Sequence, residues 1–279
     1  MRAPAEAASQ VAEALAVLRA RGAVASELAI TLGSGLGAVA GALSGATRVP
    51  TREIPHWPAS TVAGHEGALV FGRLGAVPTV VLAGRSHRYE GYALSRVTFA
   101  VRVMRALGAR VALFTNAVGA IHPELAPGDL MLAVDHINFI GRRGLLNAAE
   151  LKSRGAARAH ASPYSPRLAA QLEHAALDAG VVLRRGTLLG GLGPSYETAA
   201  EIRMAEMAGA DAVCMSTVHE VSLAAELGLE CASISCVSNR ATGLSAQRLT
   251  HAEVQEVAGR AAERLARLLE AYARGLAAS

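Results

Sequence analysis

Residues 193–221 read GPSYETAAEIRMAEMAGADAVCMSTVHEV and carry the strongest fold signals of the chain. Thr198 and Glu201 have the spacing of a capping box, in which a hydroxyl and a carboxylate satisfy free backbone N–H groups of a first helical turn. We therefore expect a helix that begins at Thr198. Glu197 would then lie just outside this helix, with its carboxylate free to face a cleft.

The second half of this stretch repeats the pattern. Residues 211–215 form a short apolar run typical of a buried strand, and Thr217 with Glu220 forms another capping box. Ser216 would lie at the start of that second helix, where free N–H groups and the helix dipole favour an anion. A strand between two helices predicts an α/β fold. Because capping boxes also begin ordinary helices, a purely structural role for Ser216 stays open.

Length and composition indicate one α/β domain. The chain has 279 residues, of which 52% are hydrophobic, and strand and helix signals alternate without a linker-like stretch. We therefore expect a single domain over residues 1–279. The three cysteines, Cys214, Cys231 and Cys236, show no CxxC spacing. This favours reduced core residues of a cytoplasmic protein over a disulfide framework or a metal site.

Charge and hydropathy argue against several other classes of protein. The formal net charge is +4 and the arginines are scattered, so no basic stripe indicates a nucleic acid partner. Glu6 and Glu13 interrupt the apolar pattern at the N-terminus, which predicts a helix and not a signal peptide. No uncharged apolar stretch is long enough to span a bilayer, so we expect no membrane partner.

A glycine-rich turn follows the first apolar strand pattern. Residues 28–32 are expected to form a buried strand that runs into GSGLG at 33–37 and then an alanine-rich helix, an arrangement whose backbone N–H groups and Ser34 hydroxyl suit a phosphate. The letters also fit the G-x-G-x-x-A fingerprint of nicotinamide-dependent oxidoreductases. That fingerprint needs a second buried strand ending in an acid. Glu53 has about the right distance, but the two prolines in residues 54–58 make a poor strand.

A β-hairpin is predicted next, with strands at residues 68–74 and 77–83 joined at a glycine. It ends in GRSHRYEGY, where Arg85 and His87 alternate on one face and Tyr89 follows at the same spacing. A guanidinium and an imidazole on one face of the chain can both donate hydrogen bonds to a single oxyanion. For each residue alone, a solvated charge or ordinary packing is the usual interpretation. With Tyr89 at the same spacing, the structural and the functional interpretation are about equally good.

Further strand patterns end in polar turns. Residues 111–114 are followed by TNAVG, residues 129–134 by DHIN, and residues 229–237 by SNRATG. Ligands gather at the carboxyl ends of strands in open α/β sheets. Residues 250–253 form a third capping box at the start of a long terminal helix, where the dipole would keep His251 neutral.

Taken together, the chain resembles the trimeric purine nucleoside phosphorylases over nearly its whole length. The matching motifs, in chain order, are GSGLG at 33–37, STVAGHEG at 60–67, GRSHRYEGY at 84–92, TNAVGAI at 115–121, PSYETAAE at 194–201, GADAVCMSTVHEV at 209–221 and VSN at 237–239. The resemblance implies a twisted central mixed β-sheet flanked by helices. It also implies a homotrimer with sites near the subunit interfaces.

The activity that the resemblance implies is the reversible phosphorolysis of purine (deoxy)ribonucleosides such as inosine and guanosine. The products would be the free base and (deoxy)ribose 1-phosphate, as in purine salvage. Inorganic phosphate would be a co-substrate, and no metal or organic cofactor would be needed.

The same resemblance assigns roles to individual residues. Phosphate would be held by Ser34, Arg85, His87, Asn116, Ala117 and Ser216. The ribose would be lined by Tyr89, Met215 and His251, with His251 at the 5′-hydroxyl. The purine would be stacked on Tyr196 and bonded by Glu197 and Asn239. The residues expected to matter most for catalysis are Asn239, Glu197 and His87.

Departures from the family pattern keep alternatives open. Residues 141–164 do not match the family's NPL-x-GPN segment, and the aromatic residue that a neighbouring subunit supplies would have to be Tyr164 or His160. An altered 5′ side would favour a 5′-methylthio-purine nucleoside phosphorylase, against which His251 argues. Two further alternatives are the oxidoreductase and a nucleoside-binding protein without catalysis. Cys214 and His219 also stand where the family commonly has Gly and Pro.

Overall fold

A nine-stranded mixed β-sheet forms the centre of the protein, with strand order β2-β3-β4-β1-β5-β8-β7-β6-β9. The structure is a computed structural model that describes residues 3–33, 35–62, 67–141, 146, 162–245 and 251–277. The strands are β1 (Leu28–Leu32), β2 (Ser44–Pro50), β3 (Ala68–Leu74), β4 (Val77–Ala83), β5 (Val111–Ala120), β6 (Leu130–Asn138), β7 (Leu183–Gly190), β8 (Ala212–Cys214) and β9 (Glu230–Arg240).

Part of the sheet closes on itself. Strand β5 pairs with β8 on one side and runs parallel to β9 on the other, and β9 also pairs with β6. Strands β5, β8, β7, β6 and β9 therefore form a closed ring, from which β1, β4, β3 and β2 continue as an open sheet. Closure removes free strand edges in this half of the sheet.

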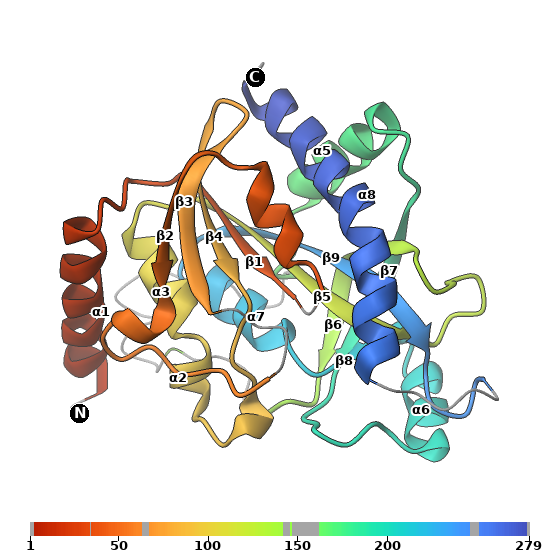
Figure 1. Cartoon of the computed structure of the whole chain (residues 1–279). Helices are drawn as coiled ribbons and strands as arrows, with labels where there is room; N and C mark the ends of the chain where they lie inside the picture. Colours follow the sequence, from red (N-terminus) through yellow and green to blue (C-terminus); the bar gives the residue numbers. More distant parts are fainter. Residues whose placement is uncertain are drawn as a thin grey trace.

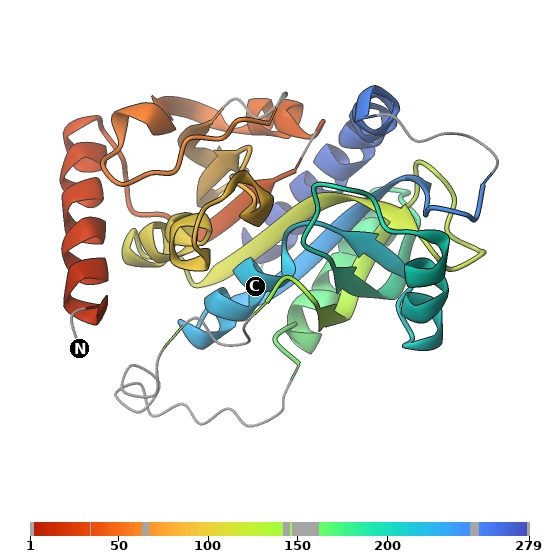
Figure 2. The same cartoon turned by 90° about the horizontal axis from the view of Figure 1, so that it is seen from below.

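Helices cover both faces of the sheet, as Figures 1 and 2 show. The helices are α1 (Ala3–Ala20), α2 (Leu94–Val97), α3 (Phe99–Ala106), α5 (Pro166–Asp178), α6 (Ala199–Met207), α7 (Val218–Glu226) and α8 (His251–Ala277). One core lies under α1, α3 and α7, and a second lies under α5 and α8. Burial of these two apolar layers is the main source of stability of the fold. The predicted α/β class with a mixed central sheet is confirmed.

The predicted hairpin and the predicted starts of two helices are confirmed. The predicted hairpin is β3–β4 with the same bounds. Helices α6 and α7 begin at the two predicted capping boxes, with Thr198 and Thr217 as N-caps. No helix in the described part of the chain is long and apolar enough to cross a membrane.

Predictions of local structure were wrong at the ends of three strands and after the glycine-rich turn. Residues 135–138 and 238–240, which were expected in polar turns, are the last residues of β6 and β9. Residues 115–119 were expected to form a turn, but β5 runs on to Ala120 because it stays paired with β9 over this length. The segment after the glycine-rich turn is a short 3₁₀ helix, Gly37–Ala42. The strand that follows it, β2, pairs antiparallel with β3 and not with β1. Residues 28–50 therefore do not form the parallel βαβ unit that dinucleotide binding requires.

Candidate active site

A cleft opens where the ends of β4, β5 and β9 meet the segments before α6 and α7. It contains about 740 Å³ of empty space, part of it open to solvent. Its lining residues are Gly33, Arg85, His87, Tyr89, Asn116, Ala117, Val118, Gly119, Tyr196, Glu197, Val213, Cys214, Met215, Ser216, Ser238, Asn239, Ala241 and Thr242. Every predicted site residue whose side chain is described is among them.

The structure does not describe the side chains of two predicted site residues. Ser34 lies outside the described residues, directly after Gly33. His251 is the first residue of α8, and its side chain is likewise outside what the structure describes. For both residues the assigned role stays a prediction.

The end of β1 lies against β5 at the floor of the cleft. The N–H of Gly33 donates to Thr115 Oγ1 over 3.2 Å. A Cβ atom at Gly33 would lie 2.7 Å from Cα of Asn116, so the approach of the two strands requires glycine here. This contact brings the Asn116–Ala117 backbone beside the glycine-rich turn.

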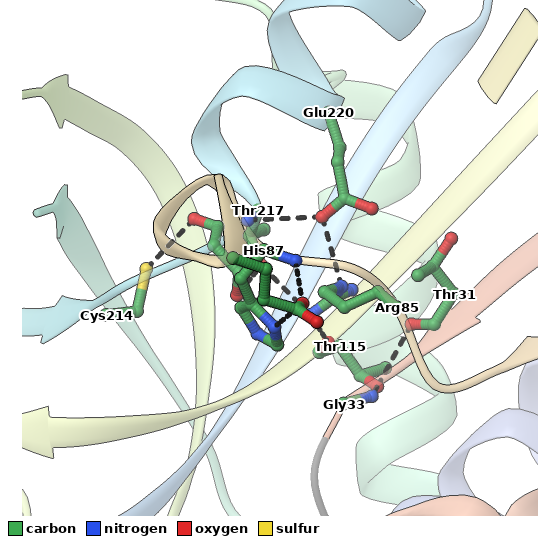
Figure 3. A network of polar contacts seen from close by, with 10 residues as sticks. Thr31, Gly33, Arg85, His87, Thr115, Cys214, Thr217 and Glu220 are labelled. Carbon is green, nitrogen blue, oxygen red and sulfur yellow. Dashed lines mark hydrogen bonds and ion pairs between the residues drawn. The ribbon is translucent and has the colours of Figure 1, made fainter. Parts of the chain in front are cut away.

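Arg85 enters the cleft from the exit of β4 and is 5% exposed. Its Nη1 donates to the carbonyl of Thr115 over 2.8 Å and to Ser216 Oγ over 3.3 Å. Its Nε lies 3.1 Å from Glu220 Oε2. Figure 3 shows the guanidinium between β5, the start of α7 and the Glu220 carboxylate. The side chain is thus fixed from several directions before any ligand binds.

His87 is held by a carboxylate that the sequence prediction missed. Its backbone N–H donates to Glu90 Oε1 over 2.5 Å, and its Nδ1 lies 3.4 Å from the same oxygen. Burial opposes ionisation of Glu90, but hydrogen bonds from His87 and Thr61 outweigh burial and lower its pKa to about 2. The His87 ring also stacks on Tyr89, with centroids 4.8 Å apart. The capping-box spacing of His87 and Glu90 was the available signal.

Glu197 and Asn239 line another part of the cleft, its base end: Asn239 pairs with Gly119, four residues further along β5 than the Thr115 carbonyl to which Arg85 donates. Glu197 lies immediately before α6, and burial raises the pKa of its carboxyl. Asn239 accepts from Ser238 Oγ over 2.6 Å and donates from Nδ2 to the carbonyl of Arg240 over 2.8 Å, which fixes the orientation of its amide. Tyr196 lies at the mouth and is 43% exposed.

Tyr89 and Met215 also line the cleft. Burial raises the pKa of the Tyr89 phenol to about 12, so this hydroxyl keeps its proton at neutral pH. A Cβ atom at Gly193 would lie 2.5 Å from Met215 Sδ and 2.9 Å from Cδ1 of Tyr89. Only glycine allows this packing, which brings the segment before α6 down onto both side chains.

Tyr164 does not fit the role of an aromatic residue supplied to a neighbouring subunit. It is 6% exposed, its hydroxyl lies 3.1 Å from His136 Nδ1, and it does not line the cleft. That prediction was wrong, because the apolar body of Tyr164 is needed in the core of its own chain. The other candidate, His160, lies outside the described residues.

The fold is that of the phosphorylase superfamily, whose family model matches residues 27–274. Purine nucleoside phosphorylase 1 of Geobacillus stearothermophilus is 42% identical over 96% of this chain and 97% of its own. The purine nucleoside phosphorylase of Mus musculus is 39% identical over 87% and 86%, respectively. A crystal structure of the Schistosoma mansoni enzyme in complex with adenosine has a TM-score of 0.83 at 30% identity and covers 95% of both chains. The chain therefore belongs to the purine nucleoside phosphorylases of this superfamily.

Proposed function

We propose that this chain catalyses the reversible phosphorolysis of 6-oxopurine (deoxy)ribonucleosides, inosine and guanosine, to the free base and (deoxy)ribose 1-phosphate. One observation carries the proposal. One cleft is lined by a guanidinium, an imidazole and a hydroxyl, from Arg85, His87 and Ser216, and, further along β5, by Asn239 together with Glu197. Such a cleft suits a substrate pair with an oxyanion at one end and a purine at the other.

The phosphate end follows from its donors. A guanidinium, an imidazole and a hydroxyl, with the backbone of Asn116–Ala117 and the hydroxyl of Ser34, match the oxygens of a tetrahedral anion. Bound phosphate attacks the anomeric carbon of the nucleoside, so the C–O bond forms as the glycosidic bond breaks. Tyr89, Met215 and His251 line the ribose, with His251 at the 5′-hydroxyl.

The base end stabilises the leaving group. The purine stacks on Tyr196, Glu197 accepts the N1–H of a 6-oxopurine, and Asn239 bonds N7 or O6. As the glycosidic bond stretches, the sugar becomes cationic and the purine gains negative charge. Phosphate stabilises the first charge and Asn239 the second, so both interactions strengthen in the transition state. Adenine offers an acceptor at N1, which leaves two acceptors face to face and disfavours it.

The assembly and location form part of the same proposal. Residues 1–279 make one nucleoside phosphorylase domain, three copies associate as a homotrimer, and the enzyme acts in the cytoplasm. Three free, buried cysteines support a reducing compartment.

The direct test supplies inosine with and without phosphate and couples released hypoxanthine to xanthine oxidase. We expect base release that depends on phosphate, and a loss of more than about 100-fold in Arg85→Met, which removes the charge but keeps most of the apolar stem. An exposed-site control, Arg203→Met on α6, should retain activity. Guanosine, adenosine and methylthio nucleosides then define specificity. No release from inosine or guanosine at any phosphate concentration would contradict the proposal.

A further inference from the structure

Arg85 and Glu220 form a buried ion pair behind the phosphate end of the cleft. Arg85 Nε lies 3.1 Å from Glu220 Oε2, and the two side chains are 3% and 2% exposed. When one partner of such a pair is removed, the other is left as an uncompensated buried charge. Arg85 lines the cleft, whereas Glu220 is not among the described residues that line it. Glu220 can therefore affect a bound ligand only through its neighbours.

The second partner of Glu220 is a strained turn. The N–H of Thr217 donates to Glu220 Oε2 over 3.2 Å. Thr217 has φ 70° and ψ −55°, a conformation that β-branched residues rarely adopt. The N–H of Val218 donates to the carbonyl of Ser216 over 2.8 Å and closes a γ-turn around Thr217. A γ-turn with positive φ persists only where surrounding contacts hold it.

This γ-turn sets the position of Ser216. Arg85 Nη1 donates to Ser216 Oγ over 3.3 Å, so guanidinium and hydroxyl stand side by side at the cleft. The same carboxylate oxygen of Glu220 contacts the guanidinium at Nε and the turn at the Thr217 N–H. Figure 3 shows both contacts converging on that oxygen. Glu220 Oε2 thus links the Arg85 side chain to the γ-turn that carries Ser216, and both offer donors to an anion.

We propose that Glu220 is a positioning residue for the co-substrate phosphate, an inference that rests on the function proposed above. Its carboxylate locks Arg85 and the γ-turn in one arrangement, so that the guanidinium and the Ser216 hydroxyl reach the same oxyanion. Without it the strained turn relaxes and the guanidinium loses its anchor at Nε. The base end of the cleft, at Glu197 and Asn239, does not depend on this link.

The test compares Glu220→Gln and Glu220→Asp with the wild-type protein. Gln keeps the size of the side chain and removes its charge. Asp keeps the counter-charge for Arg85 in the fold but shortens the reach by about 1.5 Å. The control, Glu206→Gln, removes an exposed carboxylate from α6. In both Glu220 variants the phosphate KM should rise about tenfold or more, while the inosine KM at saturating phosphate stays within about twofold.

Phosphate binding to the free protein, followed by calorimetry, measures the same effect without turnover. Its Kd should rise in parallel with the phosphate KM. Unchanged phosphate KM and Kd in a folded Glu220 variant, or equal rises in the KM of phosphate and inosine, would overturn the positioning role. Failure of the proposed function has a different signature, because wild-type protein would then bind phosphate and release no base.

Discussion

Asn239 is the residue whose chemistry bears most directly on base choice. Its amide can donate to the O6 atom of hypoxanthine, whereas a carboxylate at the same place would accept from the 6-amino group of adenine. We expect Asn239→Asp to shift the ratio of kcat/KM for adenosine over inosine upward by about tenfold or more. Steady-state kinetics with both nucleosides measures this ratio.

The control for this substitution is Asn138→Asp at the end of β6. Asn138 accepts from the N–H of Ile140 through Oδ1, an interaction that Asp retains, and it does not line the cleft. The ratio of kcat/KM for adenosine over inosine in Asn138→Asp should match that of the wild-type protein. An unchanged ratio in Asn239→Asp would count against the assignment of this residue to the base.

His219 is one buried group through which acid lowers the stability of the fold. It is 1% exposed, and neither ring nitrogen has a hydrogen-bond partner among the described residues. Burial, then the nearby charges of Arg85, His87 and His136, lower its pKa to about 3. The unfolded chain takes up this proton near pH 6.5, so the free energy of unfolding falls as the pH drops from 6.5 towards 3. The slope contributed is up to about 1.4 kcal/mol per pH unit.

His219→Leu removes that titration together with two buried nitrogen atoms. We expect equal or higher stability at pH 7 and a shallower loss of stability between pH 6.5 and 4. Denaturant unfolding at several pH values measures the slope. His174→Leu, at a side chain that is 79% exposed, is the control and should keep the wild-type slope. A slope in His219→Leu equal to that of the wild type would show that this imidazole is not buried neutral.

At the scale of the element, the N-terminal cap of α6 stabilises the helix and also holds the adjacent residues that line the base end of the cleft. Thr198 Oγ1 accepts from the N–H of Glu201 over 3.2 Å, and Glu201 Oε2 accepts from the N–H of Thr198 over 2.7 Å. Thr198→Ala should cost about 1 kcal/mol of stability. Because Tyr196 and Glu197 directly precede this cap, the inosine KM should rise while the phosphate KM stays the same.

Thr198→Ser is the matched variant, because it retains the capping hydroxyl. Thermal unfolding and the two KM values should stay near those of the wild type. If the Ala and Ser variants lose stability equally, the methyl packing of Thr198 matters and the cap does not.

The sequence predicted those elements whose signals are local. A capping box joins residues three apart, and the strands of the β3–β4 hairpin are neighbours in the chain, so their spacing is visible in the letters. The extension of β5 was missed because its polar and glycine residues favour a turn, and only pairing with the distant β9 makes them a strand. Likewise, the contact of Glu220 with Arg85 joins residues far apart in sequence. The motifs predicted candidate site residues, and the pairing of strands distant in sequence brings those whose side chains are described into one cleft.

At the scale of the whole molecule, the cleft lies beside apolar surface that one chain leaves open. Phe139, Leu192 and Met204 are 54%, 48% and 48% exposed and line a groove that shares Tyr196 and Glu197 with the cleft. Exposed apolar patches of this kind indicate contact with another macromolecule. The proposed homotrimer would cover this groove with a second copy of the chain and would shield the base end from water.

Sedimentation velocity therefore tests the assembly and its link to activity together. We expect wild-type protein to sediment with three times the chain mass of 28.6 kDa. Leu192→Glu should shift it towards the single chain and reduce turnover, because a buried, unpaired carboxylate opposes association. Val182→Glu, at a side chain 71% exposed and at the opposite end of β7, should change neither. A fully active wild-type protein with the mass of one chain would refute the trimer, and with it the idea that the cleft is completed by a neighbour.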